Sequence, residues 1–363
     1  MAPPAKKQKV NNSKSLIVFQ SPGLKPDVSL KVFDVEFHVN STLLKLHSAF
    51  FRTFLDSADK VTSASTNITA NADSGSGSTS DTTPPEASAT RESMVYGEMK
   101  YKWVTKVDEG EKDKWHLVAD NPKAEMFEKL LSSVYLRPYS IDSILKLTDL
   151  TDMADYYRML PIVSHTLSNA LLDSQEFIKQ INTNPCVVFK AAAKLRHKVL
   201  FREALVWVVA DWRFPAFKED GELLNPRLRQ VARCVYGEIA TMVSRSTSKI
   251  MDGFLAAGCT EWLESFGKGV IDPQKEEHWD ACDLYLSDRP ALSLPKFFQN
   301  IVYNDDLPYD VSIDPLYLSD LLRNNLVLDQ AGRVAGEGDE KDCFLCAKIE
   351  DEDLPWDPEE HDW

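Results

Sequence analysis

The sequence lacks the features that would send a chain into a membrane or a secretory pathway. No stretch approaches the roughly twenty consecutive apolar residues that a membrane helix needs. The first thirty residues hold no apolar run followed by a small-residue cleavage site, which a secretory signal would have. We therefore expect an intracellular protein without a membrane partner, whose 6 cysteines are reduced thiols.

Positive charge is also scarce, with 41 lysine and arginine residues against 56 acidic residues and a formal net charge of -15. A nucleic-acid groove needs a basic footprint, so we expect no nucleic-acid partner. The acids are unevenly spread, because 12 of them lie between Glu337 and Trp363 beside only 2 lysines. This run predicts an acidic tail over residues 331–363 that is solvated and partly disordered.

Signatures of catalysis and cofactor binding are missing as well. The 7 histidines show no HExxH spacing, and the glycines of "FGKGV" do not have the spacing of a phosphate-binding loop. Cys343 and Cys346 form a CxxC pair, which we interpret as two free thiols, with a zinc site or a redox pair as the alternatives. The prediction is a protein that is not an enzyme and holds no cofactor or metal.

What the sequence does contain begins with two alternating runs, residues 28–32 and 35–39, which predict a tight antiparallel hairpin. Asn40 or Ser41 can then cap a helix. Its apolar positions recur at three- and four-residue spacing and predict a broad apolar helix face. They are Leu43, Leu44, His47, Phe50, Phe51, Phe54 and Leu55.

Composition divides the rest of the chain. Residues 61–92 are rich in serine and threonine and predict a disordered insertion. "YGEMKYKWVTKV" and "KWHLVA" predict a second hairpin, after which helical periodicity dominates. We therefore expect a disordered basic N-terminus (1–23), an α+β domain (24–175), a helical region (176–330) and the acidic tail. The basic run "KLRHKVLFR" is interpreted as a solvated helix face, with an acidic partner as the alternative.

The order of these elements resembles the BTB/POZ domain. "PDVSLKV" and "VEFHVN" are similar to the first two strands of that family, and "LLKLHSAFFRTFL" to its helix with Ser-x-x-Phe, here Ser48 and Phe51. "MFEKLLSSVYLRPY" and "LTDLTDMADYYRM" resemble two later helices, the second matching Ala-Asp-x-Tyr. The insertion and the added hairpin depart from the family and resemble its filamentous-fungal members. The resemblance implies a small sheet capped by a cluster of short helices, with a β-hairpin insertion, followed by an all-α region.

The resemblance also implies a function, namely protein binding through homodimerisation or through docking of a partner such as the cullin scaffold of a ubiquitin ligase. A helix that is apolar over more than one face suits this role. Leu44, His47 and Phe51 are candidates for the dimer or partner interface, with burial in the core as the equal alternative. Asp27 is a candidate for the dimer seam or an ordinary strand-start acid, whereas Leu43, Phe50 and Phe54 are expected in the core.

The basic N-terminus gives a second functional hypothesis. Lys6, Lys7 and Lys9 follow two prolines and are typical of a short nuclear import signal, although such clusters also serve only to solubilise a chain. The leading hypothesis is therefore an interaction scaffold, in a specific form a substrate adaptor of a cullin-RING ubiquitin ligase. The alternative is a nuclear regulatory protein that oligomerises on chromatin-associated partners without binding DNA.

Overall fold

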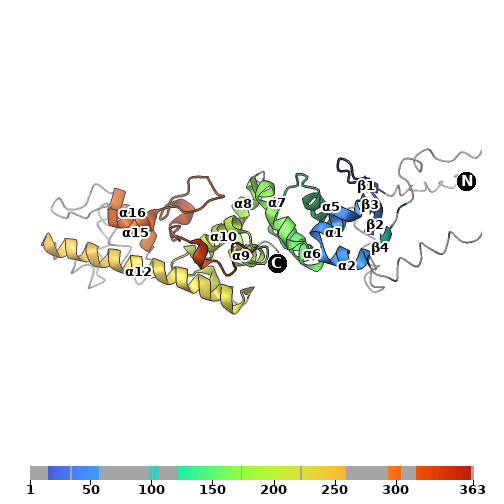
Figure 1. Cartoon of the computed structure of the whole chain (residues 1–363). Coiled ribbons are helices and arrows are strands. Elements are labelled where there is room, and N and C mark those ends of the chain that lie inside the picture. The colour runs from blue at the N-terminus through green and yellow to red at the C-terminus, as the bar shows by residue number, and fades with distance from the viewer. Residues whose placement is uncertain are drawn as a thin grey trace, which may run out of the picture. The chain divides into compact units, whose positions relative to one another are not determined.

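The structure is a computed structural model of the whole chain (Figure 1). It describes residues 15–32, 35–56, 99, 101–104, 122–172, 174–220, 223–258, 293–303 and 316–360. The chain divides into two compact units. The sheet unit comprises residues 1–139 and 152–163, and the helical unit comprises residues 140–151 and 164–363. The α+β class predicted from the sequence is confirmed.

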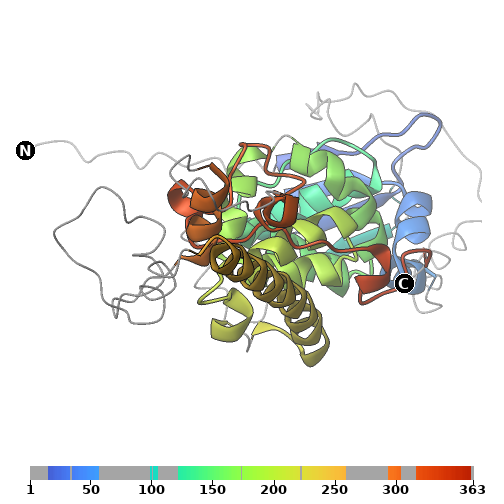
Figure 2. The ribbon, with the colours of Figure 1, turned by 90° about the vertical axis from the view of Figure 1, so that its left-hand side faces the viewer.

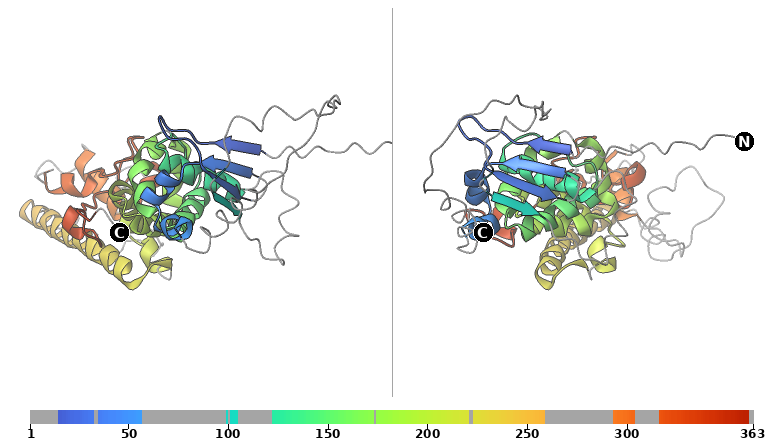
Figure 3. Two further views of the ribbon diagram at one scale, coloured as in Figure 1. Left: turned by 45° about the vertical axis from the view of Figure 1, so that its right-hand side comes forward. Right: turned by 90° about the vertical axis from the view of Figure 1, so that its right-hand side faces the viewer.

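The sheet unit is built on four strands that lie side by side in the order β1-β3-β2-β4 (Figure 3). The predicted hairpin is confirmed, since β2 (Val28–Val32) pairs antiparallel with β3 (Val35–Val39), Val28 opposite Val39. Two parallel neighbours enclose it, β1 (Ser15–Val18) beside β3 and β4 (Tyr101–Val104) beside β2. The second strand of the other predicted hairpin, and the insertion at 61–92, lie outside the described residues.

The helix predicted after the hairpin is two helices, α1 (Ser41–His47) and α2 (Ala49–Leu55), and this corrects the sequence prediction. Ser48 separates them in an extended conformation, with φ -140° and ψ 113°. Its hydroxyl accepts the N–H of Phe51 at 3.0 Å and donates to the carbonyl of Tyr157 at 2.6 Å. A buried serine is therefore the N-cap of α2 and fixes where the second helix starts.

Aromatic rings form the core between the sheet and the helices of this unit. Phe37 of β3 lies 5.4 Å from Phe127 of α5 (Pro122–Val134), and Phe127 lies 5.4 Å from Tyr157, measured between ring centroids. Arg137 covers the Phe19 ring with its guanidinium 4.8 Å from the ring centroid. These contacts join segments that are far apart in sequence and hold the sheet against α5.

The second unit is mostly helical, and helices make up most of the described part of residues 176–330, with irregular chain at 211–215 and 323–330. Figure 2 shows the long helix α12 beside α15 and α16. None of the helices in the described ranges has the length and apolar character needed to span a membrane. The helices of the unit are α6 (Ile144–Tyr156) and α7 (Leu160–Leu172), both shared with the sheet unit, α8 (Gln175–Gln180), α9 (Pro185–Lys194), α10 (Lys198–Ala210), α11 (Ala216–Glu219), α12 (Pro226–Ala256), α15 (Leu294–Tyr303) and α16 (Leu316–Leu322), with short 3-10 turns at Ile181–Thr183, Gly338–Glu340 and Asp351–Asp353.

Two predicted boundaries differ from the structure. The expected disordered N-terminus of residues 1–23 is wrong over Ser15–Val18, because these residues form β1. The expected domain boundary after residue 175 is also displaced, since residues 164–175 group with the helical unit. At β1 the sequence signal was short, and the strand that pairs with it, β3, lies elsewhere in the chain.

The acidic tail is the largest correction. The N–H of Phe344 donates to the carbonyl of Ala210 at 2.9 Å, and the N–H of Asn325 donates to the carbonyl of Leu345 at 2.9 Å. Phe344 and Leu345 are fully buried. Residues 343–349 therefore pack into the helical unit through the apolar side chains that alternate with the acids. The composition of the tail had predicted a solvated end.

Candidate docking surface

Two of the predicted interface residues belong to the core. Leu44 of α1 and Phe51 of α2 are fully buried within the sheet unit. The Phe51 ring stacks on Tyr157 with centroids 5.6 Å apart and planes inclined by 7°. The prediction that these two side chains face a partner is therefore wrong, because their own chain already covers them.

Asp27 has a structural role at the start of β2. Its carboxylate accepts the N–H and the hydroxyl proton of Ser41, both at 2.6 Å. Asn40, the N-cap of α1, accepts the N–H of Thr42 at 2.9 Å, so the two side chains share the first turn of the helix. His47, at the end of α1, is half-buried, and burial lowers its pKa, which favours the neutral ring.

The surface of α2 carries an aromatic group that we name the aromatic face, formed by Phe50, Phe54 and Tyr156. Phe50 and Phe54 are half-buried and stack with centroids 6.0 Å apart and planes inclined by 7°. Tyr156 is the last residue of α6 and is 66% exposed, and its ring centroid lies 5.7 Å from that of Phe50. The expectation that Phe50 and Phe54 lie wholly in the core is corrected, because they border solvent. Leu43, which we also expected in the core, is half-buried.

Charged side chains lie on the same helices as these rings and just after them in sequence. Arg52 is exposed and donates from Nε to the carbonyl of Lys45 at 3.1 Å, and Lys45 pairs with Asp56. Asp155 and Arg158 form an exposed pair at 3.7 Å. Aromatic rings with a polar rim are the usual anatomy of a protein–protein interface. The surface therefore has the composition of a docking site, on residues adjacent to those that the sequence had indicated.

The CxxC pair has the chemistry of buried thiols. Burial raises the pKa of Cys343 and of Cys346 to about 12, so both thiols are protonated at neutral pH. Within the described ranges no group of three or more His, Cys, Asp or Glu side chains is placed to hold a metal ion. His361 lies outside those ranges.

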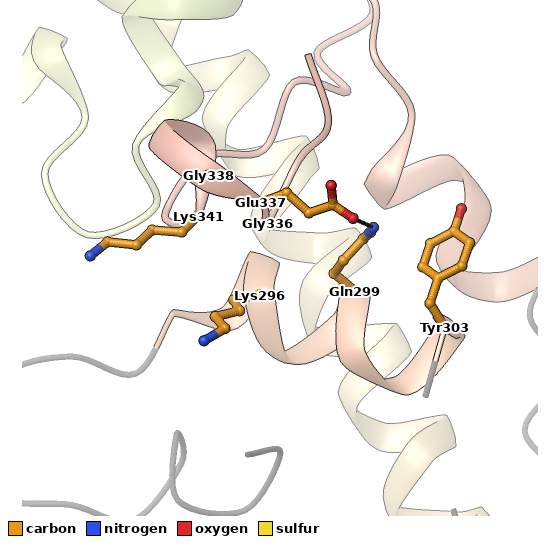
Figure 4. Close-up of a pocket in the computed structure, with 7 residues that line it drawn as sticks. All are labelled: Lys296, Gln299, Tyr303, Gly336, Glu337, Gly338 and Lys341. Carbon is orange, nitrogen blue, oxygen red and sulfur yellow. Dashed lines mark hydrogen bonds between the residues drawn. The ribbon is translucent and has the colours of Figure 1, made fainter. Parts of the chain in front are cut away.

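A hollow of about 550 Å³ between α15 and the 336–341 segment is shown in Figure 4. Gln299 donates from Nε2 to the Glu337 carboxylate at 2.7 Å, while the ammonium groups of Lys296 and Lys341 point away from that bond. Gly336 has φ +84°, and a Cβ there would lie 2.5 Å from the carbonyl oxygen of Pro295. The polar groups do not converge on one point, so the hollow offers no catalytic arrangement.

Sequence patterns could have found part of the aromatic face. Phe50 and Phe54 are four residues apart, which puts them on one side of a helix, and Phe51 points elsewhere. Tyr156 gave no such signal, because its contact with Phe50 joins segments about a hundred residues apart in sequence. The proposed import residues Lys6, Lys7 and Lys9 lie outside the described residues and stay a prediction.

No family model, no curated protein and no solved structure matches this chain.

Proposed function

We infer that the protein is a non-enzymatic interaction scaffold that self-associates or docks protein partners through its sheet unit. The observation that carries this inference is the aromatic face, on which Tyr156 is 66% exposed beside the stacked rings of Phe50 and Phe54. Leaving such rings in water is unfavourable, and burying them against a second protein surface releases that cost. Aromatic side chains are also the residues that dominate binding energies at interfaces.

The occupant that we favour is a second copy of the chain. The helices that carry the aromatic face and the residues next to them hold both signs of charge, in the pairs Asp155–Arg158 and Lys45–Asp56, and a surface with both signs can meet its own copy without net repulsion. A hairpin followed by helices is also the element order of the BTB/POZ family that the sequence resembles. Within that resemblance, docking of a cullin scaffold by a ubiquitin ligase adaptor is the more specific form of the proposal.

The mass of the full chain in solution tests this function. We expect a concentration-dependent dimer by sedimentation velocity, and Tyr156→Glu should shift it to monomer because the charge cannot be desolvated. Leu172→Glu is the matched control, since Leu172 also ends a helix and is 68% exposed, but lies outside the aromatic face. The control should dimerise as the wild type does.

Co-purification of a cullin with the tagged full chain tests the adaptor form. Retention of the cullin by wild type and by Leu172→Glu, with loss in Tyr156→Glu, would support a shared docking surface. A wild-type chain that stays monomeric up to high concentration and retains no cullin would contradict the proposed function in both forms.

The basic N-terminus supports a second candidate, a nuclear regulatory protein that oligomerises on chromatin-associated partners. Its support is the sequence around Lys6, Lys7 and Lys9. Deleting residues 5–10 in a fluorescent fusion should move the protein out of the nucleus. An unchanged distribution would remove this candidate and would leave the scaffold proposal untouched.

A further inference from the structure

The helical unit carries a basic surface that a segment of the same chain partly occupies. We name residues 350–360 the acidic strap. Arg196 Nη1 lies 2.6 Å from Glu360, and Arg202 Nη2 lies 2.8 Å from Asp351. Lys198 Nζ also reaches Asp351, at 3.4 Å. The basic run that we expected to be a solvated helix face therefore faces acids, and these acids come from the tail.

Apolar contacts fix the register of the strap on this surface. Leu354 is buried, and the Trp356 ring meets Phe201 of α10 edge-on with centroids 4.9 Å apart. Before them, Glu350 and Asp353 close a short turn, each side chain accepting a backbone N–H of the other. The strap thus binds as an acidic peptide would, with an apolar anchor between two sets of ion pairs.

The strap does not use all of the positive charge. A groove of about 660 Å³ beside it is lined by Lys190 and Lys194 of α9, by Arg196, and by Arg227 at the start of α12. In the part of the chain that the structure describes, no carboxylate pairs with Lys190 or Arg227. Both side chains are exposed. The groove therefore offers cations to a ligand with more acids than the strap brings.

The ion pairs of the strap are individually weak. Their side chains are partly exposed, between 26% and 51%. Exposed pairs of this kind change an equilibrium by only about 1.4-fold to fivefold each. The strap nevertheless has the advantage of being tethered, with an effective concentration in roughly the millimolar range. The strap can therefore exclude a weak ligand and be displaced by a stronger one.

We propose that the basic groove of α9, α10 and α12 is a docking site for an acidic peptide segment of a partner protein, and that the acidic strap is its built-in competitor. A suitable partner presents clustered carboxylates around an apolar or aromatic anchor, because that is the chemistry the groove already accepts from Asp351, Trp356 and Glu360. This site lies in the helical unit and does not depend on the aromatic face of the sheet unit.

The test uses the full chain and, as the probe, a fluorescein-labelled peptide with the sequence of residues 350–360. Anisotropy titrations compare wild type with the double variant D351N/E360Q, in which the ion pairs of the strap are removed. We expect the variant to bind the peptide roughly tenfold more tightly, since three exposed pairs no longer hold the competitor. Binding should weaken as salt rises, because these charges are solvent-accessible.

A matched control separates the contacts of the strap from the net charge of the chain. E352Q/E359Q removes the same two negative charges, from exposed acids that form no ion pair with described residues. It should bind the peptide as wild type does. If it gains as much affinity as D351N/E360Q, the effect is one of net charge and the proposed competition is wrong.

A second set of variants tests the groove itself. The probe here is a labelled peptide with the strap sequence and three further glutamates, because the strap itself reaches neither Lys190 nor Arg227. K190E/R227E, introduced into the D351N/E360Q chain, should reduce binding of this extended peptide at least tenfold without touching a strap contact. Both positions are exposed, so the circular dichroism spectrum and melting temperature should stay unchanged. Failure of the D351N/E360Q chain to bind the strap peptide, or binding of the extended peptide that K190E/R227E does not alter, would overturn the proposal. None of these outcomes bears on the dimer experiment.

Discussion

Burial in the helices at 41–55 and in the C-terminal segment at 331–360 departs from what their compositions suggest, in opposite directions. The first is rich in leucine and phenylalanine, yet Leu46 is 64% exposed and the rings of Phe50 and Phe54 border solvent. The second is crowded with acids, yet Phe344 and Leu345 are fully buried. Composition averaged over a segment therefore predicted neither burial nor exposure. Whether a side chain is buried or exposed depends on where its own helix or segment places it.

Residues 327–329, which lead into the acidic segment, are held by a buried carboxylate of the helical unit. Glu203 of α10 is fully buried, and its carboxylate accepts the N–H groups of Val327, Leu328 and Asp329 at 2.6 to 3.0 Å. Burial raises the pKa of Glu203, and these three bonds act against that effect. One carboxylate thus replaces the backbone partners that an irregular segment lacks.

The largest expected effect comes from removing that carboxylate. Glu203→Ala leaves three N–H groups without an acceptor and a cavity in α10, so the free energy of unfolding should fall by about 4 kcal/mol. Urea unfolding followed by tryptophan fluorescence measures the change. Glu352→Gln, at an exposed position of the acidic segment, is the control and should change stability by less than about 0.5 kcal/mol. A Glu203→Ala chain as stable as wild type would show that the segment is not anchored there.

The apolar helices allow a sharper comparison, because α1 holds a matched pair of leucines. Leu44 is fully buried and Leu46 is exposed. Leu44→Ala should lower the free energy of unfolding by about 3 kcal/mol, through lost burial and a residual cavity. Leu46→Ala should leave it within about 0.5 kcal/mol of wild type. Equal losses in the two variants would mean that the buried and exposed faces of α1 are assigned wrongly.

In the helical unit, His197 should make the stability of the protein depend on pH. It caps α10 by accepting the N–H of Leu200 at 3.1 Å, and its Nε2 lies 2.9 Å from the Ser168 hydroxyl. Burial lowers the pKa of His197 to about 4, from 6.5 in the unfolded chain. Between these values the unfolded chain binds more protons, so stability is lost as the pH falls below 6.5.

With a folded pKa of about 4, His197 should lower the free energy of unfolding by about 2 kcal/mol when the pH falls from 7.5 to 5. Chemical unfolding at a series of pH values measures it. His197→Asn keeps a capping side chain and removes the titration, so its stability should vary less over this range. Parallel pH profiles of the two chains would show that His197 is not the group responsible.

Local patterns in the sequence predicted the parts of the fold that depend on local physics. The alternation at 28–32 and 35–39 predicted the hairpin, and Asn40, one of the two predicted caps, is the N-cap of α1. Long-range partners decided the rest. β1 exists because β3 offers it an edge, and Ser48 breaks the helix because the Tyr157 carbonyl accepts its hydroxyl. No window of neighbouring residues contains that information.

For the candidate sites too, the sequence showed the local features but not the long-range contacts. The sequence indicated a helix that does carry partly exposed aromatic rings, but it indicated Leu44 and Phe51, which are buried by contacts with other elements. The basic run around Arg196 and the acidic tail were each visible, but their pairing across about 150 residues was not. Charge patterns predict which surfaces attract one another, and only the fold decides whether they meet.

The smallest expected effect tests how the sheet unit fixes α1. Asp27→Ala removes the acceptor of both the Ser41 N–H and the Ser41 hydroxyl, whereas Ser41→Ala removes only the hydroxyl bond. Because Asn40 still caps the helix, Asp27→Ala should lower the free energy of unfolding by about 1 kcal/mol and Ser41→Ala by less. Both variants should keep the solution mass of wild type if Asp27 is a structural residue. A dimer that is lost in Asp27→Ala but kept in Ser41→Ala would instead return Asp27 to the seam between two copies.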